Sequence, residues 1–134
     1  MVQERSLASR PLLTVAEDLE LAGLIWQPEI GDEVAARADR EQISILVDPQ
    51  GLTPPELRSV FLWIPTVEQM VAQFEARQAI LFHAGLELTE SKIAYKTVVT
   101  AKIGMIESYA ESLRTSMALA LRDLLISSKQ GIIN

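Results

Sequence analysis

The 134-residue sequence contains no cysteine and a single histidine, His83. The absence of thiols excludes a disulfide scaffold and any metal site built from thiolates. A lone imidazole excludes metal centres made of several histidines, including the HExxH motif. The acidic turn at residues 29–33 lacks the spacing of an EF-hand loop. We therefore predict no metal site.

Long apolar runs are also missing. No stretch approaches the 18 or so uncharged apolar residues of a membrane-spanning helix, and the most apolar window, residues 117–126, contains Arg122 and Asp123. The apolar run at residues 11–16 is short and is followed at once by Glu17, which argues against a signal peptide. We therefore expect a cytoplasmic protein with no membrane partner.

Basic residues are few. Lys and Arg number 12 against 18 Asp and Glu, for a formal net charge of −6. Residues 1–67 hold the imbalance, with 5 basic and 11 acidic side chains. A general nucleic-acid binder needs clustered cations to neutralise phosphates. We therefore predict no nucleic-acid partner and an acidic face on the first half of the chain.

The length and the composition indicate one domain. Hydrophobic residues make up 49% of the chain, enough for a buried core, and no Gly/Ser-rich or Pro-rich linker interrupts it. We predict a single domain over residues 1–134, with residues 1–10 as a flexible arm.

Strand-like patterns occur in both halves of the sequence. In the first half they are the apolar run at 21–26, a weak segment at 33–37 and an alternating segment at 43–47, which together suggest a hairpin or small meander. In the second half, residues 80–88 and 93–103 alternate with strand periodicity, the latter with one core face and one lysine-bearing face.

Three capping boxes mark helix starts. Thr53, Thr66 and Ser108 each stand three residues before Glu or Gln. They predict a short helix that ends before Pro65, a helix at 66–77 and a helix at 109–128. The predicted fold class is α+β: an antiparallel sheet covered on one face by two helices, with a small N-terminal β unit and the short helix.

Catalytic motifs are absent. No serine lies in GxSxG or SxxK, and neither GxGxxG nor a P-loop occurs. His83 shares strand parity with Glu87, which could orient it, but an exposed strand histidine without a chemical role is the commoner case. Trp26 and Trp63 each end an apolar run before a proline turn, which favours packing at the edge of the core, although such aromatic corners also line apolar pockets. We predict no catalytic residue.

Three segments carry a family resemblance: IWQPEIGDEV, FLWIPTVEQM and SYAESLRTSMALALRDLL. Together they are similar to small uncharacterised bacterial α+β proteins, some of which are described as heme-binding. The resemblance implies a non-covalent heme, because CxxCH attachment needs cysteine. His83 would then be the imidazole ligand, with Met70, Met105, Tyr95 or Tyr109 as candidates for the second ligand.

The surplus of apolar surface predicts a homodimer. Residues 117–126 are apolar around much of the expected helix, Val98 and Leu81 have outward strand parity, and residues 60–64 form an apolar run. Large exposed apolar patches mark interfaces, and two-fold pairing is the commonest solution.

The absent motifs and the apolar surface together predict a non-enzymatic function in binding or assembly, with no cofactor and a possible small apolar ligand. The alternative is heme binding through His83.

Overall fold

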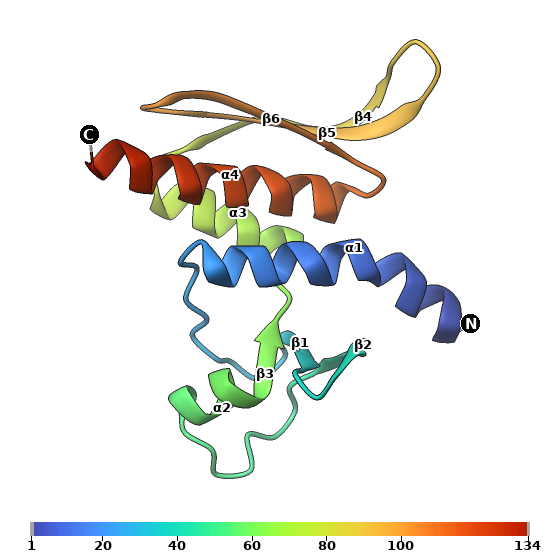
Figure 1. Ribbon diagram of the computed structural model, residues 1–134, viewed down its shortest axis with the longest axis vertical. Helices are drawn as coiled ribbons and strands as arrows, with labels where there is room; N and C mark the ends of the chain where they lie inside the picture. The colour runs from blue at the N-terminus through green and yellow to red at the C-terminus, as the bar shows by residue number, and fades with distance from the viewer. Residues whose placement is uncertain (1, 134) are drawn as a thin grey trace. The chain divides into compact units, whose positions relative to one another are not determined.

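The computed structural model describes the backbone of residues 2–133 and the side chains of residues 11–129. The chain forms two compact units, residues 1–65 (unit 1) and residues 66–134 (unit 2). Their elements are labelled in Figure 1. Unit 1 contains α1 (Val2–Leu21), β1 (Glu33–Ala36), β2 (Asp39–Ile45), α2 (Pro54–Val60) and β3 (Phe61–Trp63). Unit 2 contains α3 (Val67–Ala76), β4 (Ile80–Leu88), β5 (Ile93–Ala101), β6 (Gly104–Ala110) and α4 (Leu113–Ile133).

Helices and two antiparallel three-stranded sheets make this an α+β protein, as the sequence predicted. The division into two units does not decide whether they fold as one domain, so the single-domain assignment stays a prediction. No helix among the described residues is long and apolar enough to cross a membrane.

Helix α1 is the largest departure from the sequence prediction. The backbone of residues 2–10, expected as an arm, is the first half of this helix, and Met1 lies outside the described residues. Residues 21–26, expected as a strand, instead end the helix. Gly23 has a φ of 108°, and the Leu24 N–H donates to the Leu19 carbonyl at 3.0 Å. This is a Schellman turn, in which glycine takes the left-handed conformation that stops a helix.

The sheet of unit 1 has the strand order β2-β1-β3. The expected hairpin of β1 and β2 is present, and the third strand is β3, which pairs antiparallel with β1. Helix α2 begins with the expected capping box of Thr53 and Glu56 and, as expected, ends before Pro65, at Val60; strand β3, which follows it, was not predicted. Buried Trp26, Val34, Leu46 and Leu57 form the core of this sheet region.

The sheet of unit 2 has the order β4-β5-β6. Thr97 of β5 and Ser108 of β6 lie opposite each other, and both hydrogen-bond to Ser116 of α4, so their face of the sheet carries the helices. Helix α3 starts at the expected capping box of Thr66 and Gln69. The sheet covered on one face by two helices was predicted correctly.

The start of α4 and the existence of β6 were not predicted. Ser108 is a buried strand residue, and the capping position belongs to Ser112, whose hydroxyl oxygen accepts the Thr115 N–H at 3.1 Å. A bulge in β4 between Leu81 and His83 also changes the expected alternation. It places Ile80 opposite Thr100 on the outer face and Leu81 opposite Val99 on the helix-covered face.

Candidate functional site: an indole-lined pocket

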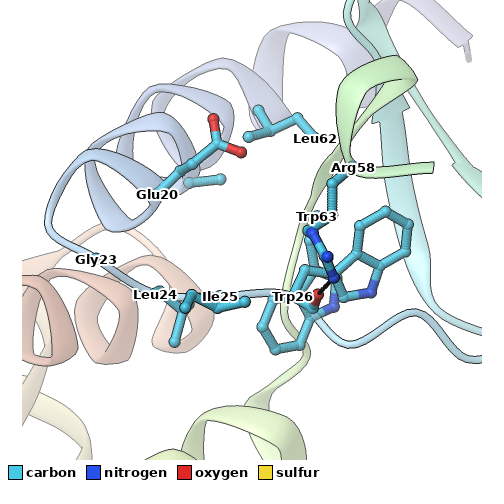
Figure 2. A pocket seen from close by; sticks show the side chains of 9 residues that line it. Glu20, Gly23, Leu24, Ile25, Trp26, Arg58, Leu62 and Trp63 are labelled. Atoms are coloured by element: carbon cyan, nitrogen blue, oxygen red, sulfur yellow. Dashed lines mark hydrogen bonds between the residues drawn. The ribbon is translucent and has the colours of Figure 1, made fainter. Parts of the chain in front are cut away.

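A pocket of about 450 Å³ lies within unit 1. Figure 2 shows its walls, with Glu20 on one side and two indole rings together with Arg58 on the other. The size falls in the range of small-molecule sites, which are mostly apolar with a few polar groups. The lining residues are Ala16, Glu20, Gly23, Leu24, Ile25, Trp26, Arg58, Leu62 and Trp63.

Two chain reversals assemble the pocket. The Schellman turn at Gly23 ends α1 and leads residues 24–26 along the wall. The junction of α2 and β3 supplies Arg58 from the helix and Leu62 and Trp63 from the strand. Both tryptophans of the chain therefore line one pocket. Trp26 also packs in the core, so it has both of the roles considered for it, core packing and pocket lining.

Trp26 is fixed by a buried carboxylate. Its indole N–H donates to Asp32 Oδ2 at 2.8 Å, and the Glu29 backbone N–H donates to the same oxygen at 2.9 Å. Asp32 is only 5% exposed. A buried carboxylate is retained where donors satisfy it, and these bonds in turn hold the indole ring in place.

Trp63 differs from Trp26 in the hydrogen bonding of its indole N–H. Its indole Nε1 is buried and has no hydrogen-bond acceptor among the described residues. A buried donor without an acceptor costs about 1–3 kcal/mol. Such orphaned groups are uncommon in native proteins and call for an explanation.

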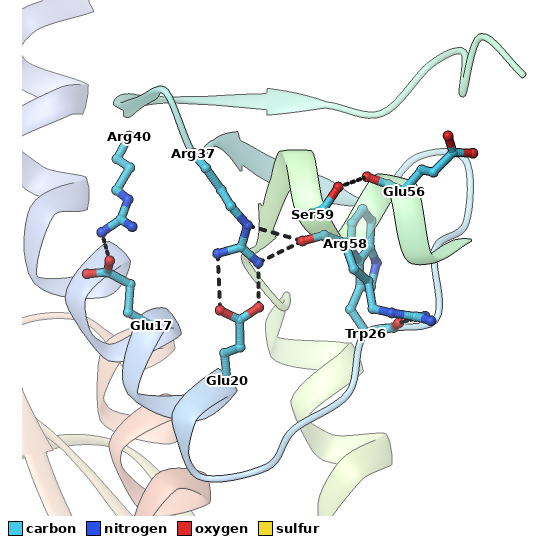
Figure 3. A network of polar contacts seen from close by, with 8 residues as sticks. All are labelled: Glu17, Glu20, Trp26, Arg37, Arg40, Glu56, Arg58 and Ser59. Carbon is cyan, nitrogen blue, oxygen red and sulfur yellow. Dashed lines mark hydrogen bonds and ion pairs between the residues drawn. The ribbon is translucent and has the colours of Figure 1, made fainter. Parts of the chain in front are cut away.

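Figure 3 shows a network of ion pairs and hydrogen bonds that includes the pocket residues Glu20 and Arg58. Arg37 donates from Nη1 and Nη2 to the two carboxylate oxygens of Glu20, and from Nε and Nη2 to the Arg58 carbonyl. Arg40 of β2 forms an ion pair with Glu17, which lies on α1 as Glu20 does. These contacts tie the β1–β2 hairpin to α1 and to the end of α2, so they brace the pocket walls.

Arg58 is the cation that lines the pocket itself. Its side chain is half-buried, and Nη1 donates to the Trp26 carbonyl at 2.9 Å. No carboxylate among the described residues pairs with it. The carboxylate that shares the pocket, Glu20, is taken up by Arg37 in a two-pronged ion pair.

The residues singled out for heme do not lie together. His83 and Met105 are exposed on the outer face of the unit 2 sheet, opposite Val98 and Thr100 of β5. Met70 is fully buried in α3, and Tyr95 has the strand parity of Thr97 on the helix-covered face. The sheet therefore separates Met70 and Tyr95 from His83.

Glu87, expected to orient His83, has a different neighbour. It shares the outer face with His83, but its carboxylate lies 3.4 Å from Lys96 Nζ. Lys96 also lies over the Tyr109 ring, 5.5 Å from its centroid. The hydrogen bond to Tyr109 contributes most to raising the pKa of Lys96, with Glu87 and Glu107 adding to it against the effect of desolvation.

Sequence reasoning missed Glu20, Arg37 and Arg58. The sequence carries no local signal for these three side chains. The one available clue to the pocket was Gly23, because a glycine after an apolar segment is typical of a helix end. Comparison of the chain with protein-family models, with curated proteins and with solved structures gives no match.

Proposed function

We propose that the protein is a non-enzymatic, cytoplasmic binding protein whose unit 1 pocket holds a small, planar, largely apolar molecule. The observation that carries this proposal is the meeting of both indole rings on one pocket of about 450 Å³. Aromatic walls offer large rigid contact area to a flat ligand. The bonds of Trp26 to Asp32 and of Arg37 to Glu20 hold the walls in place before a ligand arrives.

A titration with a neutral planar probe tests the pocket. The chain has two tryptophans, so a ¹⁵N-labelled sample shows two indole N–H signals in a proton–nitrogen correlation spectrum. We expect 2-naphthamide to shift both signals saturably. As a variant, Ile25→Glu places a charge at an exposed lining position, adds no indole signal and should weaken the shifts. Unchanged indole signals at millimolar probe would contradict the proposal.

We further propose assembly into a homodimer through the β4–β5 hairpin. In the surfaces first considered, Val98, Leu121, Leu62 and Ile64 are buried, and the exposed residues are Val60 at 43% and Ile126 at 42%. Further exposed apolar side chains lie near the hairpin end. Phe82 is 73%, Leu86 60%, Leu88 77% and Ile93 69% exposed. Leu88 and Ile93 are directly opposite each other, so they form one apolar patch with Leu86.

Light scattering tests the dimer. We expect the mass of two chains at tens of micromolar, and Leu88→Glu should shift it to one chain. Val47→Glu is the matched control, because Val47 is equally exposed at 75% but lies in unit 1. A single-chain mass for the unmodified protein would refute the dimer, and a dimer that survives Leu88→Glu would refute this surface.

Heme binding through His83 stays the alternative, supported by the resemblance and by the exposure of the only imidazole. Hemin added to the purified protein should then give a Soret shift with a defined stoichiometry. An identical titration of His83→Ala would remove His83 as the ligand. Because Met70 and Tyr95 lie on the other side of the sheet, Met105 and Tyr109 are the second ligands to test by substitution.

A further inference from the structure

We infer that the ligand of the unit 1 pocket carries a carboxylate on its planar apolar body and that Arg58 receives this group. The inference rests on the proposed binding function and adds the charge of the ligand. It follows from which charges in the pocket wall already have partners and which do not.

The negative charge of the pocket wall is already compensated. Glu20 accepts one N–H from Nη1 and one from Nη2 of Arg37, the two-pronged geometry that guanidinium and carboxylate favour. A cationic ligand between the indoles would find this carboxylate occupied. It would also lie close to Arg58, whose like charge repels it.

The positive charge of the pocket wall lacks a carboxylate. Arg58 donates one N–H to the main-chain carbonyl of Trp26, and its remaining N–H groups have no acceptor among the residues described. A guanidinium presents five donors in a planar fork that matches a carboxylate. Half-buried beside two indole rings, it would bind a carboxylate more strongly than a fully hydrated cation would.

The indole N–H of Trp63 does not add to the donors that a ligand can reach. Trp63 lines the pocket, but its Nε1 is closed off from solvent. The unused donors that a ligand in the pocket can reach are therefore those of Arg58. A ligand that brings acceptor oxygens complements them, whereas a ligand that brings donors does not.

Calorimetry with three probes of one shape tests the inference: 2-naphthoate, neutral 2-naphthamide and cationic 2-naphthylmethylammonium. We expect 2-naphthoate to bind at least about tenfold more tightly than 2-naphthamide, the gain of one charge-assisted hydrogen bond. The ammonium probe should bind most weakly. Equal or tighter binding of 2-naphthamide would overturn the inference and leave the proposed function intact, whereas no binding by any probe would overturn both.

Two variants locate the carboxylate. Arg58→Gln should abolish the preference for 2-naphthoate while 2-naphthamide still binds, which shows that the pocket remains folded. Arg40→Gln makes the same charge change outside the lining residues and should keep the preference. Arg58→Lys keeps the charge without the fork and should give an intermediate preference. A preference that survives Arg58→Gln would refute the role of Arg58.

Discussion

The two units bury their polar groups in different ways. Unit 1 buries a carboxylate, Asp32, with an indole as donor, and it leaves the Trp63 indole N–H without an acceptor beside a pocket. Among the described residues of unit 2, the buried polar side chains are hydroxyls with partners: Thr97 Oγ1 and Ser116 Oγ are 2.7 Å apart, and the Ser108 hydroxyl donates to the Ser116 main-chain carbonyl. The described part of unit 1 therefore leaves one buried donor unsatisfied next to its pocket, whereas the hydroxyl cluster of unit 2 is closed.

Exposed apolar residues occur in both units, and in unit 1 they include Leu21, Ile30 and Val47. In unit 2 they gather on the β4–β5 hairpin, where Leu86, Leu88 and Ile93 face solvent in the structure. In unit 1 the largest aromatic side chains are turned inward to form pocket walls. We propose ligand binding for unit 1 and assembly for unit 2, and the following substitutions test how the two units differ in burying their polar groups.

The largest effect is expected at Asp32. Asp32→Ala leaves the Trp26 indole N–H and the Glu29 N–H without their acceptor, so the free energy of unfolding should fall by about 2–4 kcal/mol. Asp32→Asn keeps one acceptor oxygen and should lose about half as much. Urea unfolding measures both, and a loss below 1 kcal/mol for Asp32→Ala would show that the carboxylate does not hold the wall.

The hydroxyl cluster should give the next largest effect. Ser116→Ala and Thr97→Val should each lower the unfolding free energy by about 1–2 kcal/mol, because each leaves a buried hydroxyl without its partner. The double variant should cost about 1 kcal/mol less than their sum. Ser44→Ala, on exposed β2, is the control and should change little. Full additivity of the pair would contradict a closed cluster.

The smallest expected effect is the difference in unfolding free energy between variants of the two tryptophans. Trp26→Phe and Trp63→Phe remove the same ring volume, but only the first takes a donor from Asp32. The second removes an unsatisfied N–H, which offsets the lost contacts. Trp26→Phe should therefore be less stable than Trp63→Phe by about 1 kcal/mol. The opposite order in thermal or urea unfolding would break the distinction between the two indoles.

Elements with local signals were predictable from the sequence. The capping boxes at Thr53 and Thr66 gave the starts of α2 and α3, and alternation gave β4 and β5. The box at Ser108 misled, because its hydroxyl bonds to Ser116, which is brought near only by the folded unit. A short apolar run cannot distinguish a strand from a helix end, so residues 21–26 were misassigned.

The pocket was harder to predict from the sequence than the fold was. Trp26 and Trp63 were recognised as residues at apolar corners, but nothing local indicates that they meet. Their meeting depends on the pairing of β3 with β1 and on the turn at Gly23, which are tertiary features. The partners of Arg58, Glu20 and Arg37 likewise come from segments distant in the chain.

Hydrogen–deuterium exchange with and without 2-naphthoate tests the division of roles most directly. Binding in the pocket should slow exchange at the backbone amides of residues 22–26 and 58–63, the two segments that hold most of its lining residues, and should leave β4 and β5 unchanged. Arg58→Gln should lower this protection to the level that 2-naphthamide gives. Protection that falls on β4 and β5 instead, with residues 22–26 unaffected, would contradict the assignment of ligand binding to unit 1.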